Sequence, residues 1–202
     1  PTTASTSQPP PSPHSDEEHR MKPKGPLAAA ALAVLVPLTL LAGPVSPAAA
    51  APEDDPLVRA DLLTAYGTTL KYHRLEKALE DGYVPFRDCV ALAGEGAMGY
   101  HYVNPAYNNL TDPTKPAALM YEKGADGSMT LVGVEWFVED ADQDLATDDD
   151  RPSMFGQPFI GPSPGVVEGM KVHYDLHVWL HKPNPKGLFH EWNPDVTCPS
   201  QS

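Results

Sequence analysis

The chain has 202 residues, with 27 acidic and 14 basic side chains, and its formal net charge at pH 7 is −13. Such an acidic protein repels phosphate backbones, so we expect no nucleic-acid partner. The part that follows residue 50 is long enough for one domain with its own hydrophobic core.

Residues 1–20 are rich in Pro, Ser and Thr and carry almost no large apolar side chain. Such a segment cannot bury enough surface to offset its ordering entropy. We therefore predict that residues 1–20 are disordered and do not belong to the natural protein, which would start at Met21.

Residues 21–50 follow the order of a secretory signal peptide. Lys22 and Lys24 form a basic start, residues 27–41 are mostly apolar, and Ala48-Ala49-Ala50 offers a cleavage site. A membrane anchor is the alternative, but the apolar run is shorter than the roughly 20 residues that span a bilayer. We predict a secreted or extracytoplasmic protein with no stable membrane span after cleavage.

The segment 51–202 is predicted to be a single exported domain with both cysteines, Cys89 and Cys198. Two cysteines in an exported protein most simply form one disulfide. A thiolate metal pair is the alternative.

The first predicted element is one amphipathic helix over residues 56–80. Asp54-Asp55-Pro56 is typical of a helix start, and Gly82 is suited to a left-handed cap. Apolar residues then recur at helical spacing: Leu62, Leu63, Tyr66, Leu70, Leu75 and Leu79.

The rest of the domain has the patterns of strands and loops. The expected segments are extended chain over 84–90, strands over 100–103, 117–121, 130–138 and 171–180, an acidic loop over 139–150, and an irregular tail. One helix followed by strands predicts an α+β fold, in which the helix packs on an antiparallel sheet that could be barrel-like. The long C-terminal tail should pack on this sheet through Leu188, Phe189 and Trp192.

The segment 172–181 carries the strongest chemical pattern. As a strand it places Val172, Tyr174, Leu176, Val178 and Leu180 on one face, and His173, Asp175, His177, Trp179 and His181 on the other. Imidazole and carboxylate suit zinc, copper or iron. Residues four apart on a strand are about 13 Å apart, so His173, His177 and His181 cannot share one ion. A helix would bring these three together, but the β-branched and aromatic content favours a strand.

Two other strands offer partners for this face. Their phase predicts that His101 shares a face with Gly99 and Val103, and that Glu135 lies between the apolar neighbours Gly133 and Phe137. We hypothesise a site for a transition metal (Zn, Cu or Fe) with open positions. The candidate ligands are His101, Glu135, His173, Asp175 and His177. The alternative is a solvated sheet face with one tolerated glutamate.

The acidic loop contains Asp140-x-Asp142-x-Asp144, which is similar to the start of an EF-hand calcium loop. Leu145 stands where that loop needs Gly, and Arg151 stands where it needs Glu. We interpret the segment as a solvated acidic loop.

Several motifs together resemble a family of small, uncharacterised exported bacterial proteins. They are the segments DGYVP at 81–85, GAMGYH at 96–101, LVGVE at 131–135 and LHVWL at 176–180, with Asn184-Pro185, Asn193-Pro194 and Cys198. The resemblance implies export and a domain that covers about 70–202, and it implies no particular reaction.

Two functions follow from these patterns. The first is an exported metal-binding protein or small metalloenzyme whose partner is a metal ion or small ligand. The second is a non-catalytic binding or cell-envelope module that uses Trp179, Trp192, Tyr100 and Tyr102. Convergence of His101, Glu135 and His177 on one point would favour the first.

Overall fold

The computed structural model describes residues 51–199. The predicted disordered segment 1–20 and signal peptide 21–50 lie outside the described residues. No helix within residues 51–199 has the length and apolar character required to cross a bilayer.

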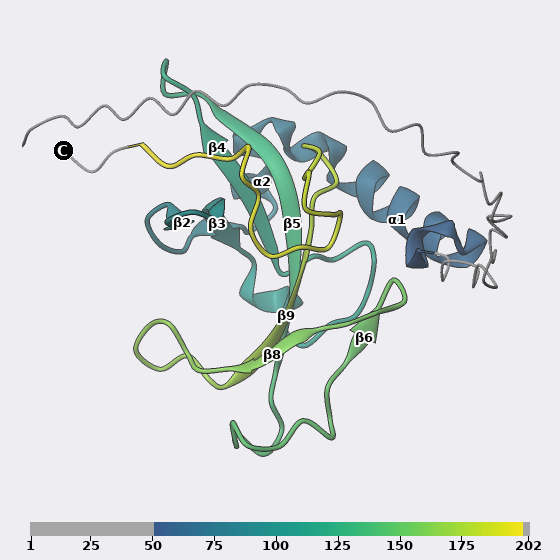
Figure 1. The fold of residues 1–202 in the computed structure, drawn as a ribbon. Helices are drawn as coiled ribbons and strands as arrows, with labels where there is room; N and C mark the ends of the chain where they lie inside the picture. Colours follow the sequence, from purple (N-terminus) through teal and green to yellow (C-terminus); the bar gives the residue numbers. More distant parts are fainter. Residues whose placement is uncertain (1–50, 200–202) are drawn as a thin grey trace, which may run out of the picture. The chain divides into compact units, whose positions relative to one another are not determined.

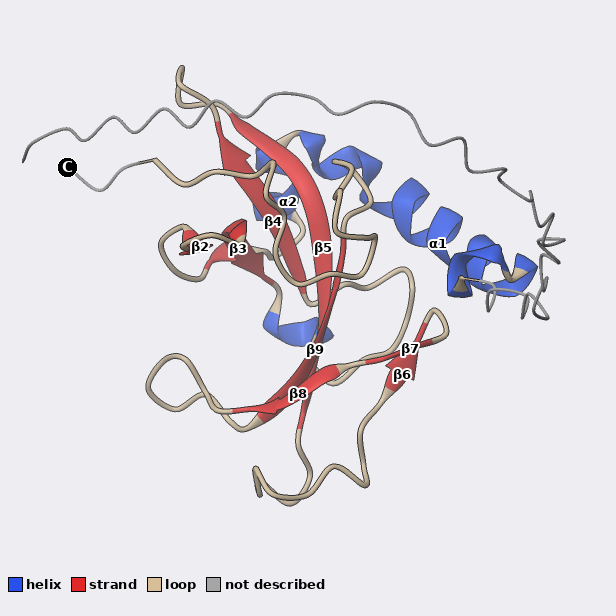
Figure 2. Cartoon of the chain, in the orientation of Figure 1, coloured by secondary structure: helices blue, strands red, loops and turns tan. Residues whose placement is uncertain are grey.

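Helices form the first part of the described chain (Figure 2). They are η1 (Pro52–Asp54), α1 (Pro56–Thr69), η2 (Leu70–His73) and α2 (Leu75–Glu80). The start of α1 agrees with the prediction, because the Asp55 side chain accepts a hydrogen bond from Leu57 N at 2.8 Å and Pro56 occupies the first turn. Gly82 follows the C-cap residue of α2 and has a φ of 93°, as expected for a left-handed cap.

The prediction of one continuous helix over 56–80 was wrong at residues 70–74, where the α-helix is interrupted. The chain tightens into η2, and Arg74 then adopts an extended conformation with φ −98° and ψ 106°. The buried Tyr121 hydroxyl donates to the backbone carbonyl of Tyr72 at 2.7 Å, a long-range contact that stabilises the break.

The buried face of the helices also differs from the predicted stripe. Leu63, Tyr66, Leu70 and Leu79 are exposed, and the residues that enter the core are Leu62, Ala65, Thr69, Tyr72 and Ala78. Local spacing could not separate these two faces, because both carry apolar side chains.

The sheet is antiparallel throughout and runs in the order β1-β3-β4-β5-β9-β8, with β2 also pairing with β3 (Figure 1). Its strands are β1 (Val84–Pro85), β2 (Val90–Leu92), β3 (Gly96–Val103), β4 (Ala118–Lys123), β5 (Met129–Glu139), β8 (Ile160–Ser163) and β9 (His173–Val178). The α+β class is confirmed. The expectation that the sheet could be barrel-like was wrong, because within residues 51–199 the sheet is open, with β1 and β8 at its ends.

Three further elements complete the described chain. A short helix, η3 (Pro105–Tyr107), connects β3 to β4, and β6 (Ser153–Met154) pairs only with β7 (Gln157–Pro158). No strand was predicted over residues 153–163, because the Pro and Gly residues there interrupt the alternating pattern of the short strands β6, β7 and β8 (Ile160–Ser163).

Side chains from the two faces of the sheet pack into two separate hydrophobic clusters. The larger cluster joins the helices to side chains such as Leu119, Val134, Trp136 and Leu176. The smaller lies on the other face and contains Ala97, Met98, Met120, Val132, Trp179 and Val196.

A bulge interrupts the alternation of side chains near the start of β5. Tyr121 pairs with Leu131 while Met120 pairs with Gly133, so Val132 is the extra residue. Val132 therefore belongs to the smaller cluster rather than to the face of Val134, and Leu131 belongs to the larger one. From Gly133 onward the predicted alternation holds.

The C-terminal tail packs along β3, as predicted. Ala97 and Asn193 exchange backbone hydrogen bonds of 3.1 and 3.2 Å, and the Asn193 side chain donates to Pro183 O at 3.1 Å. Gly96 must lack a side chain, because its Cβ would lie 2.2 Å from Asn193 O, and its φ is 110°. The predicted disulfide Cys89–Cys198 joins this tail to the segment before β2.

We predict that the Cys89→Ser/Cys198→Ser double variant is less stable by up to about 4–5 kcal/mol, because the disulfide closes a loop with a sequence separation of 109. Urea unfolding of the variant measures the loss. The wild-type protein under reducing conditions should match the variant. A variant as stable as the oxidised wild type would contradict the prediction.

Candidate metal centre

Strand β9 carries the face on which the site is built. All six of its residues are buried, and Tyr174, Leu176 and Val178 enter the larger cluster. His173, Asp175 and His177 occupy the opposite face, which confirms that the segment is a strand rather than a helix.

Cross-strand register brings the other two candidate ligands to His177. Glu135 of β5 is the direct partner of His177 of β9. His101 lies on β3, one strand beyond β4, and the β4 residue that faces Glu135 is Ala118. This small side chain leaves room above the sheet for the imidazole of His101 to reach Glu135.

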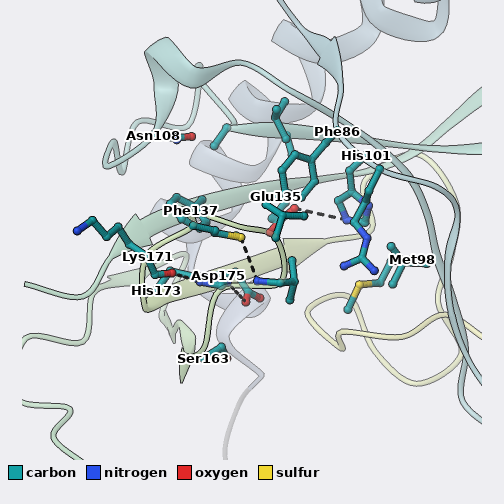
Figure 3. Close-up of a pocket in the computed structure, with 18 of the residues that line it drawn as sticks. Phe86, Met98, His101, Asn108, Glu135, Phe137, Ser163, Lys171, His173 and Asp175 are labelled. Atoms are coloured by element: carbon teal, nitrogen blue, oxygen red, sulfur yellow. Dashed lines mark hydrogen bonds and ion pairs between the residues drawn. The ribbon is translucent and has the colours of Figure 1, made fainter. Parts of the chain in front are cut away.

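The three side chains converge as the strand phases predict. One ligand atom from each of His101, Glu135 and His177 lies within 4.8 Å of the other two. The His101 Nε2 to Glu135 Oε2 distance is 3.5 Å (Figure 3). His101 is 7% exposed and His177 is 2% exposed, so water screens the cluster weakly.

Several polar atoms of the cluster have no hydrogen-bond partner among the described residues. These atoms are His101 Nδ1 and both ring nitrogens of His177. His177 Nδ1 lies 3.0 Å from Asp175 Oδ1, but the two groups are not aligned as a hydrogen bond. Buried imidazole nitrogens without partners are costly. One metal ion would bond a single nitrogen of each histidine, so it would satisfy one of the two His177 nitrogens and leave the other to a neighbour such as Asp175.

The remaining candidates lie beside the cluster. His173 Nδ1 is 3.0 Å from the backbone oxygen of Lys171, and its ring stacks on Phe137. Asp175 lies between His173 and His177, with His173 Nε2 at 3.9 Å from Asp175 Oδ2. Asp175 is therefore placed to orient His177 rather than to complete the three-residue group.

His181 is directed away from the site. The strand ends at Val178, and His181 Nε2 lies 2.8 Å from Thr69 Oγ1 at the end of α1. The prediction that His173, His177 and His181 cannot share one ion is confirmed.

The charges of the cluster depend on each other. Burial, together with the nearby charges of His177 and Arg87, lowers the pKa of His101 to about 3. Burial raises the pKa of Glu135 to about 7. Burial alone would lower the pKa of His177, but the carboxylates of Glu135 and Asp175 outweigh it and raise the pKa to about 9. His101 is thus a neutral lone-pair donor at physiological pH.

A cavity of about 740 Å³ opens above the cluster. Its walls are largely apolar and include Phe86, Met98, Phe137 and Trp192. Figure 3 shows Phe86, Met98 and Phe137 around the pair formed by His101 and Glu135. A metal ion on the three ligands would therefore face a space large enough for a small organic molecule.

Part of this cavity was not predicted from the sequence. Arg87 lies between β1 and β2 and Val90 is the first residue of β2, whereas Glu191 and Trp192 come from the C-terminal tail. We call these two segments, residues 86–90 and 191–192, the closing wall. The disulfide was the only sequence signal that could have joined them, because they are far apart in the chain.

Comparison of the chain with models of known protein families, with curated proteins and with solved structures finds no match. The resemblance to a family of exported bacterial proteins stays a prediction. The function must therefore be inferred from the geometry of the cluster and its cavity.

We predict that metal binding releases about one proton at pH 8. His177 holds a proton there because its pKa is about 9, whereas Glu135 with a pKa of about 7 is mostly ionised. A metal must displace the His177 proton, so affinity should rise with pH up to about 9 and fall more steeply below 7, where Glu135 also binds a proton. Calorimetry in two buffers with different ionisation enthalpies counts the protons, and a proton count of zero would contradict this assignment.

Proposed function

We propose that the protein is an exported transition-metal protein whose centre is formed by His101, Glu135 and His177. The observation that carries the proposal is the convergence of one ligand atom from each of these residues within 4.8 Å, with both histidines buried and Glu135 partly buried. Their identity suits a transition metal, because two imidazoles and one carboxylate leave coordination positions open on zinc or iron. The disulfide is consistent with an extracytoplasmic location.

The cavity supports a small ligand on the open side of the metal. It lies directly above the cluster and is lined by apolar side chains. A metal with open positions polarises a bound oxygen or activates a bound water. Asp175 would orient His177, and Glu135 would supply the negative charge that balances the metal.

A metal-free binding module is the second candidate, because a cavity of about 740 Å³ can bind a small molecule by itself. The aromatic residues assigned to a partner surface support it poorly. Trp179 is 2% exposed, and Tyr100 and Tyr102 pack against the larger cluster. Only Trp192 of that set lines the cavity.

The decisive experiment compares metal binding by His177→Ala with that by His173→Ala. The two histidines lie on the same face of β9, but only His177 belongs to the convergent group. Zinc, ferrous iron and copper are titrated separately, and bound metal is measured by elemental analysis after dialysis. We expect about one ion per wild-type chain and per His173→Ala chain.

For His177→Ala and Glu135→Ala we expect a loss of affinity larger than the roughly 10–100-fold typical of a group that only orients a ligand. Asp175→Asn should fall within that range. If the wild type binds none of the three metals, the metal proposal fails and the metal-free module becomes the better reading of the cavity.

A further inference from the structure

The loop between β8 and β9 forms one side of the cavity above the histidine centre, and we call its residues 164–170 the lip. The lip starts beside the centre, because Ser163 at the end of β8 pairs with His173 of β9. Val166 and Val167 line the cavity although they are 54% and 41% exposed. Among the exposed large apolar side chains of residues 51–199, only these two belong to the cavity wall. A ligand in the cavity would therefore cover apolar surface that water now contacts.

The backbone of the lip forms a closed turn that presents these valines. Met170 N donates a hydrogen bond to Val167 O at 3.1 Å, and Val166 N donates to the Met170 sulfur at 3.4 Å. Gly165 lets the two arms of the turn approach each other, because a Cβ there would lie 2.1 Å from Met170 O. The apolar tip is thus fixed at the cavity by local contacts.

The other walls continue this apolar surface around the cavity. They include Phe86, Val90, Met98, Phe137 and Trp192. The polar side chains of the histidine centre lie below them, at the base. A cavity with a polar base and apolar walls fits an amphipathic ligand whose polar head lies at the base and whose apolar part follows the walls.

The charge at the base decides which head group fits. Five carboxylates line the cavity against two basic side chains other than histidine, Arg87 and Lys171, so the metal-free cavity repels anions. A divalent ion on two neutral imidazoles and one carboxylate would reverse this locally, because one net positive charge remains at the ion. Its open positions accept carboxylate oxygens.

Arg87 adds a second positive charge close to the centre. It lines the cavity, and its charge contributes to the lowered pKa of His101. The arginines that form ion pairs within residues 51–199 are Arg59 and Arg151, so Arg87 has no carboxylate within 4.0 Å there. Its guanidinium is therefore available to an anionic ligand.

We propose that the cavity binds a monocarboxylic acid with an apolar chain, the carboxylate on the metal beside Arg87 and the chain along the lip. This inference rests on the proposed metal function. An alcohol lacks the charge that the metal and Arg87 attract, and an ammonium group would be repelled by both. A carboxylate without a chain would leave Val166 and Val167 in contact with water.

Calorimetric titration of the metal-loaded protein with acetate, butyrate, hexanoate and octanoate tests the chain. The affinity should rise along the series by up to about fourfold for each methylene that is buried. Octanol and octylamine carry the same chain with other head groups, and both should bind more weakly than octanoate. The metal-free protein should bind octanoate roughly tenfold more weakly or worse, because a contact to a charged group is lost.

Two pairs of matched variants locate the ligand. Val167→Ser should weaken octanoate and leave acetate unchanged, whereas Val84→Ser, on an exposed valine outside the cavity, should change neither. Arg87→Gln should weaken all four carboxylates by a similar factor, up to about fivefold as for an exposed ion pair. Arg74→Gln, on an exposed arginine outside the cavity, should have no such effect.

Bound metal is measured before each titration, so that the two proposals fail separately. If the wild type takes up no metal, the proposed function fails and this inference fails with it. If the wild type takes up metal but binds octanoate no more tightly than acetate or octanol, the ligand assignment alone is overturned. An unchanged affinity for octanoate in Val167→Ser or in Arg87→Gln would overturn it as well.

Discussion

The partial burial of Glu135, whose side chain is 14% exposed, is the constraint on which the candidate site depends. A carboxylate on a covered sheet face is costly to ionise, and its partners here are the buried imidazoles of His177 and His101. Without a metal, a proton on His177 supplies the balancing positive charge. With a metal, the same three groups would become ligands, so one arrangement would serve both states and the exchange between them would depend on pH.

Much of the surrounding fold has the effect of keeping this carboxylate covered while leaving space above it. Ala118 is small at the strand position that faces Glu135. Gly96 permits the tail to approach β3, which places Trp192 over the cavity. Helices α1 and α2 pack on the other face of the sheet, and none of their described residues lines the cavity.

The features that could be predicted were those that depend on local alternation. The phases of β3, β5 and β9 were sufficient to place His101, Glu135 and His177 on one face, because side chains alternate strictly along a strand. The bulge at Val132, the break at Arg74 and the closing wall depend on pairing between distant residues, which no local pattern contains. The acidic loop was predicted to be solvated, but Asp140 in it is buried. The loop folds back so that Asp150 accepts a hydrogen bond from Ala141 N, a contact that no local pattern contains.

The closing wall has a consequence for the biogenesis of the protein. All three ligands lie between residues 101 and 177, whereas Glu191 and Trp192 are among the last described residues of the chain. During synthesis the three candidate ligands precede the tail part of the wall, residues 191–192, so a metal ion could approach them from the side that the tail later covers. Formation of Cys89–Cys198 then attaches the tail covalently, so the order of metal capture and oxidation would determine which route an ion takes into the centre.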